Sequence, residues 1–77
     1  NQSLVHPREV FADAIWDRAN SIVLVHNHPS WSIEPSHEDI IVTNRLKEVS
    51  DMVWIKLLDH IIITKESYFS FNENNIL

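Results

Sequence analysis

Ile22-Val23-Leu24-Val25-His26-Asn27-His28-Pro29 is an apolar, mostly β-branched run that ends in two histidines. A short continuous run of this kind is typical of a strand covered on both faces, and we expect such a strand over residues 21–26. Residues i and i+2 of an extended chain point to the same side, so His26 and His28 can face one point in space. In α/β sheets, sites usually form at the carboxyl ends of strands, where these histidines lie.

If His26 and His28 bind a metal ion, Asp39 is the simplest candidate for a third ligand, and Ser36 lies three residues before it. The full pattern is His-x-His, seven residues, Ser, two residues, Asp. Two imidazoles and one carboxylate leave the fourth position of a tetrahedral zinc ion open to water, and zinc lowers the pKa of that water to about 7. The Ser36 hydroxyl would lie close enough to hydrogen-bond a developing oxyanion.

The same residues also fit a purely structural interpretation. Ser36-x-x-Asp39 matches a capping box, in which a serine and an acid three residues later satisfy the first backbone N–H groups of a helix. Two histidines at a strand end can simply be solvated or bonded to the backbone. However, Asp39 heads the expected inward stripe of its helix, and an inward carboxylate needs a compensating partner. The other members of that stripe are Val42, Leu46 and Val49. Both interpretations stay open on this pattern alone.

Outward from this stretch, the order helix–strand–helix–strand–strand predicts an α/β or α+β fold. Pro7 suits the first position of a helix, Arg18 would complement the dipole in its last turn, and Asn20 is the expected left-handed terminator. The expected elements are a helix over 7–19, the strand over 21–26, a helix over 36–53, a buried strand over 56–64, and a returning hairpin strand over 68–71.

Length and composition restrict the possible functions. With 77 residues the chain is one domain or a piece of one. It has no cysteine, which excludes disulfides and thiolate metal sites, and its formal net charge is −5, without a basic cluster. That balance argues against direct nucleic-acid binding, which usually requires a basic surface. No apolar run approaches the ~18 residues of a membrane span, and we expect a cytoplasmic protein.

Glycine is absent from the whole sequence. Backbone positions that need a positive φ must therefore be filled by other residues, and asparagine tolerates that region best. We expect these positions among Asn20, Asn27, Asn72 and Asn74.

The motif and its surroundings resemble the RadC family of JAB/JAMM metalloprotease-fold proteins. The likeness rests on His26-Asn27-His28-Pro29-Ser30 and on Pro35-Ser36-x-Glu38-Asp39-Ile40, with further blocks at 3–11 and 58–63. It covers the chain from about Asn1 to Phe71. The resemblance implies a partial three-layer fold similar to that of cytidine deaminases, in one domain over 1–77 that lacks its N-terminal strands.

The resemblance also implies roles for the motif residues. His26, His28 and Asp39 match the family's zinc ligands, and Ser36 matches the serine that stabilises the tetrahedral intermediate. The implied cofactor is one Zn2+ ion, and the implied activity is hydrolysis of a peptide or isopeptide bond in a protein substrate. A historical DNA-repair label also belongs to the family. True zinc deaminases differ, because their His-x-Glu and Pro-Cys-x-x-Cys motifs are absent here.

The sequence departs from the family pattern at the general base. JAMM proteases take a glutamate from a strand well upstream of His-x-His, but Glu9 is the only glutamate among the 25 residues before His26 and falls within an expected helix. We therefore expect the base to lie outside this chain. The alternative function is a catalytically inert interaction module, or a homodimer, that uses exposed tryptophans or a sheet edge.

Four further residues keep two interpretations each. Trp31 stands where the family usually has glycine, and its indole either crowds the metal cleft or covers a surface that the missing part of the domain would cover. Trp54 lies near a family turn that contains glycine. Trp54 is either a core aromatic or an exposed contact for a partner. Asp59 and His60 face opposite sides of their strand, so one of them can orient a ligand histidine, or both can be satisfied by backbone and solvent.

Overall fold

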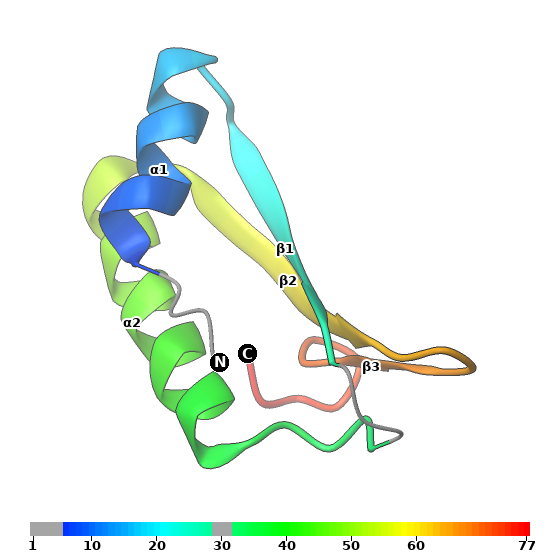
Figure 1. Cartoon of the computed structure of the whole chain (residues 1–77). Coiled ribbons are helices and arrows are strands. Elements are labelled where there is room, and N and C mark those ends of the chain that lie inside the picture. Colours follow the sequence, from blue (N-terminus) through cyan, green and yellow to red (C-terminus); the bar gives the residue numbers. More distant parts are fainter. Residues whose placement is uncertain (1–5, 29–31) are drawn as a thin grey trace.

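The computed structural model describes residues 6–28 and 32–77 and contains two helices and three strands in the expected order. They are α1 (Pro7–Trp16), β1 (Ser21–Asn27), α2 (His37–Val53), β2 (Lys56–Ile63) and β3 (Tyr68–Ser70). The sheet order is β1-β2-β3, with β1 parallel and β3 antiparallel to β2. Both helices lie on the same side of this sheet (Figure 1). The α+β fold predicted from the sequence is confirmed.

The crossover from β1 through α2 to β2 positions the candidate site. Because β1 and β2 are parallel, their carboxyl ends meet at one edge, where the backbone N–H of His28 donates to the carbonyl oxygen of Ile63 at 2.9 Å. Helix α2 runs in the opposite direction to the strands, so its first turn lies at the same end of the molecule as the end of β1 (Figure 1). The end of a strand and the start of a helix are thereby brought together.

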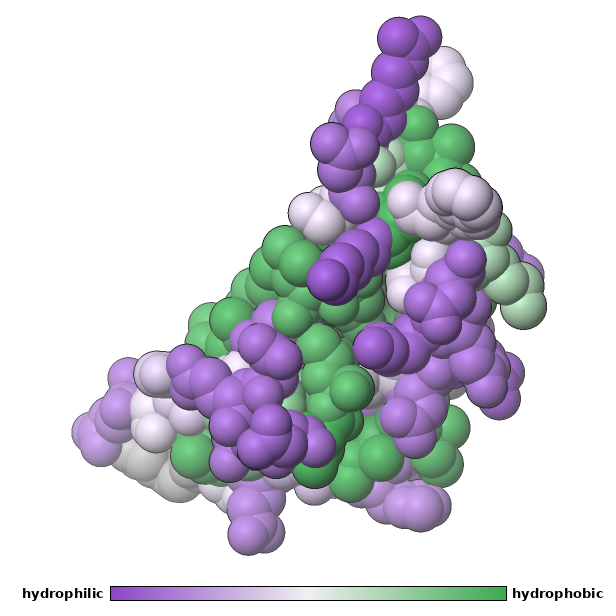
Figure 2. Space-filling model, turned by 180° about the vertical axis from the view of Figure 1, so that it is seen from behind, coloured by the Kyte–Doolittle hydropathy of each residue, from purple (hydrophilic) through white to green (hydrophobic). Residues whose placement is uncertain are grey.

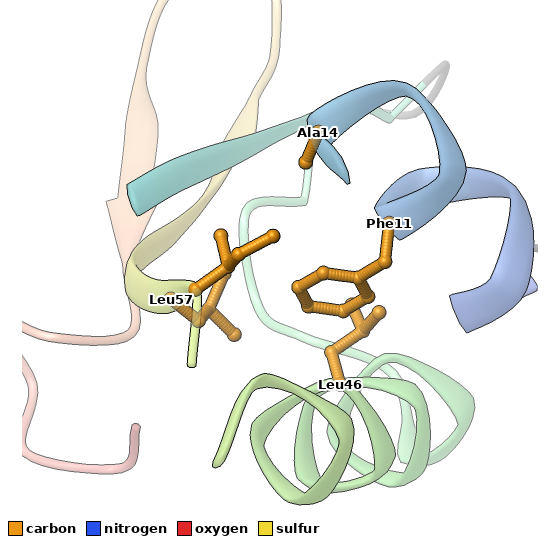
Figure 3. Packing of buried hydrophobic residues seen from close by; sticks show 5 residues of the cluster. Phe11, Ala14, Leu46 and Leu57 are labelled. Carbon is orange, nitrogen blue, oxygen red and sulfur yellow. The ribbon is translucent and has the colours of Figure 1, made fainter. Parts of the chain in front are cut away.

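A small hydrophobic core joins the helices to the inner face of the sheet. Phe11 of α1, Leu46 of α2 and Leu57 of β2 point toward one another, with Ala14 beside them (Figure 3). The inward residues of β1, Ile22 and Leu24, are partly buried against this cluster. Burying such apolar side chains contributes about 1.5–3 kcal/mol each, so this cluster supplies much of the stability that holds α2 against the sheet.

The expectation that β1 and β2 are covered on both faces is wrong for the described part of the chain. The side chains of Val23 and Val25 are 47% and 57% exposed, because alternate residues of a strand point away from the helices. Figure 2, seen from behind, shows a hydrophobic band that runs diagonally along the strands. Other exposed apolar residues of the strands are Leu58, Ile63 and Tyr68. An apolar run thus predicted the strand but not which faces are covered.

The positions with positive φ also differ from expectation. Among the described residues they are Arg18, Trp54 and Asn75, with φ of 57°, 63° and 61°, and none of the four expected asparagines. Helix α1 ends at Trp16, so Arg18 follows the helix instead of complementing its last turn. The backbone N–H of Ala19 donates to the carbonyl of Ala14 at 2.9 Å, which closes the helix as a Schellman motif requires.

Trp54 has the same role at the end of α2. It adopts φ 63° and its side chain is 89% exposed, so the core-aromatic interpretation is wrong. The next residue, Ile55, is buried, and its N–H donates to the carbonyl of Ser50 at 3.2 Å. The left-handed conformation of Trp54 therefore lets the side chain of Ile55 pack into the core.

Trp54→Gly is expected to raise the free energy of unfolding by about 1 kcal/mol, because a left-handed conformation costs a residue with a Cβ atom about 1–2 kcal/mol. Urea denaturation measures the change. Trp16→Gly is the matched control, since Trp16 is 86% exposed but lies in the right-handed last turn of α1, and it should give no gain. A lower stability for Trp54→Gly than for the parent chain would contradict the prediction.

Candidate metal centre

Three residues singled out from the sequence converge at the carboxyl end of β1. The Nδ1 atom of His26 lies 3.2 Å from Oδ1 of Asp39, and Nε2 of His28 lies 3.0 Å from Oδ2. One donor atom from each of the three residues can be chosen so that all lie within 4.8 Å of one another. The structure thus brings together the chain around the end of β1, with His26 in the strand and His28 just after it, and one helix residue from beyond the following loop.

The local backbone explains this convergence. His26 and His28 are two residues apart in extended chain, and their rings meet edge to face with centroids 4.8 Å apart. Asp39 is in the first turn of α2 and only 6% exposed, as expected for the head of an inward stripe. Its carboxylate therefore faces both rings from the opposite element.

The capping box predicted as the structural alternative is also present. The N–H of Asp39 donates to Oγ of Ser36 at 3.0 Å, and the N–H of Ser36 donates to Oδ2 of Asp39 at 2.7 Å. The two interpretations are compatible, because the carboxylate accepts from the Ser36 backbone while it faces the histidines. The cap orients the Asp39 side chain and thereby contributes to the geometry of the cluster.

The environment keeps Asp39 ionised. Burial alone would raise its pKa, but hydrogen bonds from the backbone and side chain of Ser36, and the nearby His26 and His28, outweigh burial and hold the pKa of Asp39 below its ordinary value of 3.8. A carboxylate that stays charged at neutral pH is the form that binds a metal ion.

The donor set fits a tetrahedral zinc ion. Zinc binds imidazole nitrogen and carboxylate oxygen at about 2.0–2.2 Å, which places neighbouring tetrahedral ligand atoms about 3.3 Å apart. The two histidine–carboxylate distances, 3.0 and 3.2 Å, are close to that separation but run to the two different oxygens of Asp39, and a set with one atom from each residue lies within 4.8 Å. The same nitrogen and oxygen donors also suit other divalent transition metals, so the geometry identifies a possible metal site without choosing the ion.

A second layer of polar and aromatic residues lies beneath the cluster. His60 of β2 is 1% exposed, and its Nδ1 forms a hydrogen bond with the hydroxyl of Thr43. Thr43 in turn donates to the carbonyl oxygen of Asp39 at 2.7 Å. Burial first, and then the nearby His26, lower the pKa of His60 to about 4, so this ring is neutral at pH 7.

The sequence did not single out Thr43 for this role. Its position four residues after Asp39, one helical turn away, was the available signal. Asp59, the other half of the strand pair, lies elsewhere: it accepts hydrogen bonds from the Ser70 hydroxyl and from the Asn72 N–H, and thus secures the turn after β3. Trp31 lies outside the described residues.

No helix within the described ranges, 6–28 and 32–77, is long and apolar enough to cross a membrane.

Comparison with known proteins agrees with the motif. The family model of the RadC-like JAB domain matches residues 1–76. A UPF0758 protein of Chlorobium phaeovibrioides is 58% identical over all 77 residues, which cover 34% of that relative. UPF0758 proteins of Finegoldia magna and Methanospirillum hungatei are 58% and 63% identical over 95% and 84% of this chain, which correspond to 33% and 29% of those relatives.

The matches cover most or all of this chain but only part of each relative. The chain spans about a third of the length of these curated relatives, whereas the family model matches nearly all of the chain. The motif with His26, His28, Ser36 and Asp39 lies within the matched residues. By its sequence, the chain belongs to the RadC-like JAB domain family.

Proposed function

We propose that the chain binds one zinc ion through His26, His28 and Asp39 and forms the metal-binding part of a peptide or isopeptide hydrolase. The observation that carries the proposal is the convergence of two imidazole nitrogens on one buried, ionised carboxylate. An uncompensated charge in this position would be costly, and a divalent cation would be held by all three side chains at once.

The protein residues around the site suit hydrolysis. Bound zinc supplies a Lewis acid and a water molecule whose pKa is lowered to about 7. Ser36 is exposed at the start of α2, and its Oγ accepts from the Asp39 N–H. In the metal-free chain the Ser36 hydroxyl also hydrogen-bonds the Asp39 carboxylate, and we propose that its hydrogen is donated to the substrate oxyanion once that carboxylate binds the metal.

The general base is proposed to come from residues beyond these 77. Within the described part of the chain, the metal cluster contains His26, His28 and Asp39 and does not include Glu9, Glu34 or Glu38. Because the chain spans about a third of its relatives, hydrolysis is proposed for the longer protein, and metal binding for this domain.

A second candidate function is that of an interaction module without activity. The observation in its favour is the exposed apolar outer face of the sheet, with Val23, Val25 and Ile63, which suits a protein partner or a second copy of the chain. The formal charge of −5 argues that any role in DNA repair acts through a protein partner and not through direct DNA contact by this domain.

Titration of the metal-free chain with zinc tests the metal proposal. We expect a stoichiometry of one ion per chain in competition with a chromophoric chelator. The midpoint of urea unfolding should rise as well, since a ligand at 100 times its Kd stabilises the folded state by about 2.7 kcal/mol. His37→Ala is the control, because His37 lies between Ser36 and Asp39 in sequence but outside the cluster. Absence of zinc uptake by the folded parent chain would refute the proposal.

A further inference from the structure

We propose that His60 is a positioning residue that fixes β1 and α2, the two elements that carry the candidate ligands, relative to each other. The inference rests on the proposed metal site and extends it to a residue that does not touch the metal. Strand β1 and helix α2 each pack on β2, which carries His60 in its middle. A single side chain on β2 can therefore contact both.

The contact with β1 is an aromatic stack. The rings of His60 and His26 are inclined by 18° with centroids 6.0 Å apart. On the side of β3, the ring of Phe71 stacks on His60 with centroids 4.6 Å apart and an inclination of 11°. Because β1 and β3 flank β2 on opposite sides, the three rings are stacked across the sheet. The Phe71 ring supports His60, and His60 limits the rotation of the His26 ring.

The contact with α2 is a hydrogen-bonded chain. A threonine hydroxyl has one hydrogen to donate, and Thr43 donates it to the carbonyl oxygen of Asp39. The hydroxyl oxygen is then the acceptor for Nδ1–H of His60. This arrangement assigns the proton of the neutral imidazole to Nδ1 and links the sheet to the first turn of α2, whose Asp39 carboxylate is the candidate ligand.

The second ring nitrogen of His60, Nε2, indicates that packing alone does not explain why a histidine occupies this position. Among the buried side-chain nitrogens and oxygens of the described residues, Nε2 of His60 is the one without a hydrogen-bond partner. An unsatisfied buried polar atom costs about 1–3 kcal/mol, and a phenyl ring would fill a similar space without it. What histidine adds over phenylalanine is the bond to Thr43, and hence the fixed distance between the sheet and the ligand-bearing helix turn.

The experiment compares His60→Phe, Thr43→Val and the double variant with the parent chain. We expect each single variant to weaken zinc binding about 10- to 100-fold, the usual effect of removing a residue that orients a metal ligand. The zinc affinity of the double variant should be no lower than that of the single variant with the lower affinity, because both changes break the same hydrogen bond between His60 and Thr43. The metal-free unfolding free energy of His60→Phe should stay the same or rise.

Two further measurements separate positioning from general destabilisation. Leu57→Val, in the core cluster on the same strand, is the matched control and should lower stability while leaving the zinc affinity unchanged. With Co(II) in place of zinc, the visible absorption spectrum should change in His60→Phe, since it reports coordination geometry. In the metal-free parent, long-range 1H–15N NMR correlations should show His60 protonated at Nδ1.

The outcomes distinguish this inference from the proposed function. If the folded parent chain takes up no zinc, the metal site itself is wrong, and the positioning role fails with it. If the parent binds zinc and His60→Phe binds it equally well with the same Co(II) spectrum, only the role of His60 is refuted. An Nε2–H tautomer of His60 in the metal-free protein would likewise overturn the assigned hydrogen-bonded chain.

Discussion

Asp39→Asn is expected to weaken zinc binding by more than about 100-fold while the domain stays folded. The amide has nearly the same shape and its oxygen can still accept from the Ser36 N–H, so the helix start survives. The negative charge that faces both imidazoles is lost, and a neutral amide is a much weaker zinc ligand than a carboxylate. Loss of an acid from the first turn should lower the unfolding free energy by only about 0.3–1 kcal/mol.

Glu38→Gln is the matched control for this prediction. Glu38 lies in the same first turn of α2 and interacts with the same helix dipole, but it is exposed and outside the cluster. Zinc affinity from chelator competition and stability from urea denaturation should be measured on both variants. Equal zinc affinities in Asp39→Asn and Glu38→Gln would show that Asp39 acts only as a helix cap.

Acidification of the metal-free protein is expected to lower its stability between pH 6.5 and about 4 through His60. The folded-state pKa of this residue is about 4 against an ordinary value of 6.5. Between these values the unfolded chain binds a proton that the folded chain does not, so the unfolding free energy falls as pH falls. The stabilisation from neutral His60 is fully present above about pH 6.5. A pKa shift of this size corresponds to a loss of about 3 kcal/mol of unfolding free energy by pH 4.

Urea denaturation at intervals from pH 7.5 to 4, with chelator present, measures this dependence. His60→Phe should flatten the profile in this window, whereas His37→Ala, which changes an exposed histidine, should leave the slope unchanged. Asp39 acts in a separate window, because its pKa is lowered from 3.8 and its stabilising effect is lost only at more acid pH. A His60→Phe profile as steep as that of the parent chain would refute the assignment.

The order and type of the elements were predictable because each segment has its own local pattern. Pro7 and the helical spacing after it placed α1, and the β-branched run placed β1. The end of α1, expected at residue 19, and the identity of the left-handed residues after both helices were not predictable from residue type. Arg18 and Trp54 adopt left-handed conformations because the residues after them, Ala19 and Ile55, pack into the core. Where the chain turns is set by that packing, which overrides the preference of asparagine for positive φ.

The candidate ligands could be predicted from spacing, but the residues that support them could not. His26 and His28 share a face by the alternation of a strand, and Asp39 heads an inward helical stripe by the periodicity of a helix. The links among Thr43, His60 and Asp39 join β2 to α2 across the core. No sequence period relates residues 43 and 60, so their contact follows only from the packing of the two elements.

The sequence by itself therefore determined the element order, the family and the three converging side chains, because strand and helix periods act over a few residues. Only the tertiary structure decided that the outer face of β1 is exposed, that Trp54 ends α2 in a left-handed turn, and that His60 is stacked between His26 and Phe71. The physical reason is that burial and hydrogen-bond partners depend on which surfaces of distant segments meet.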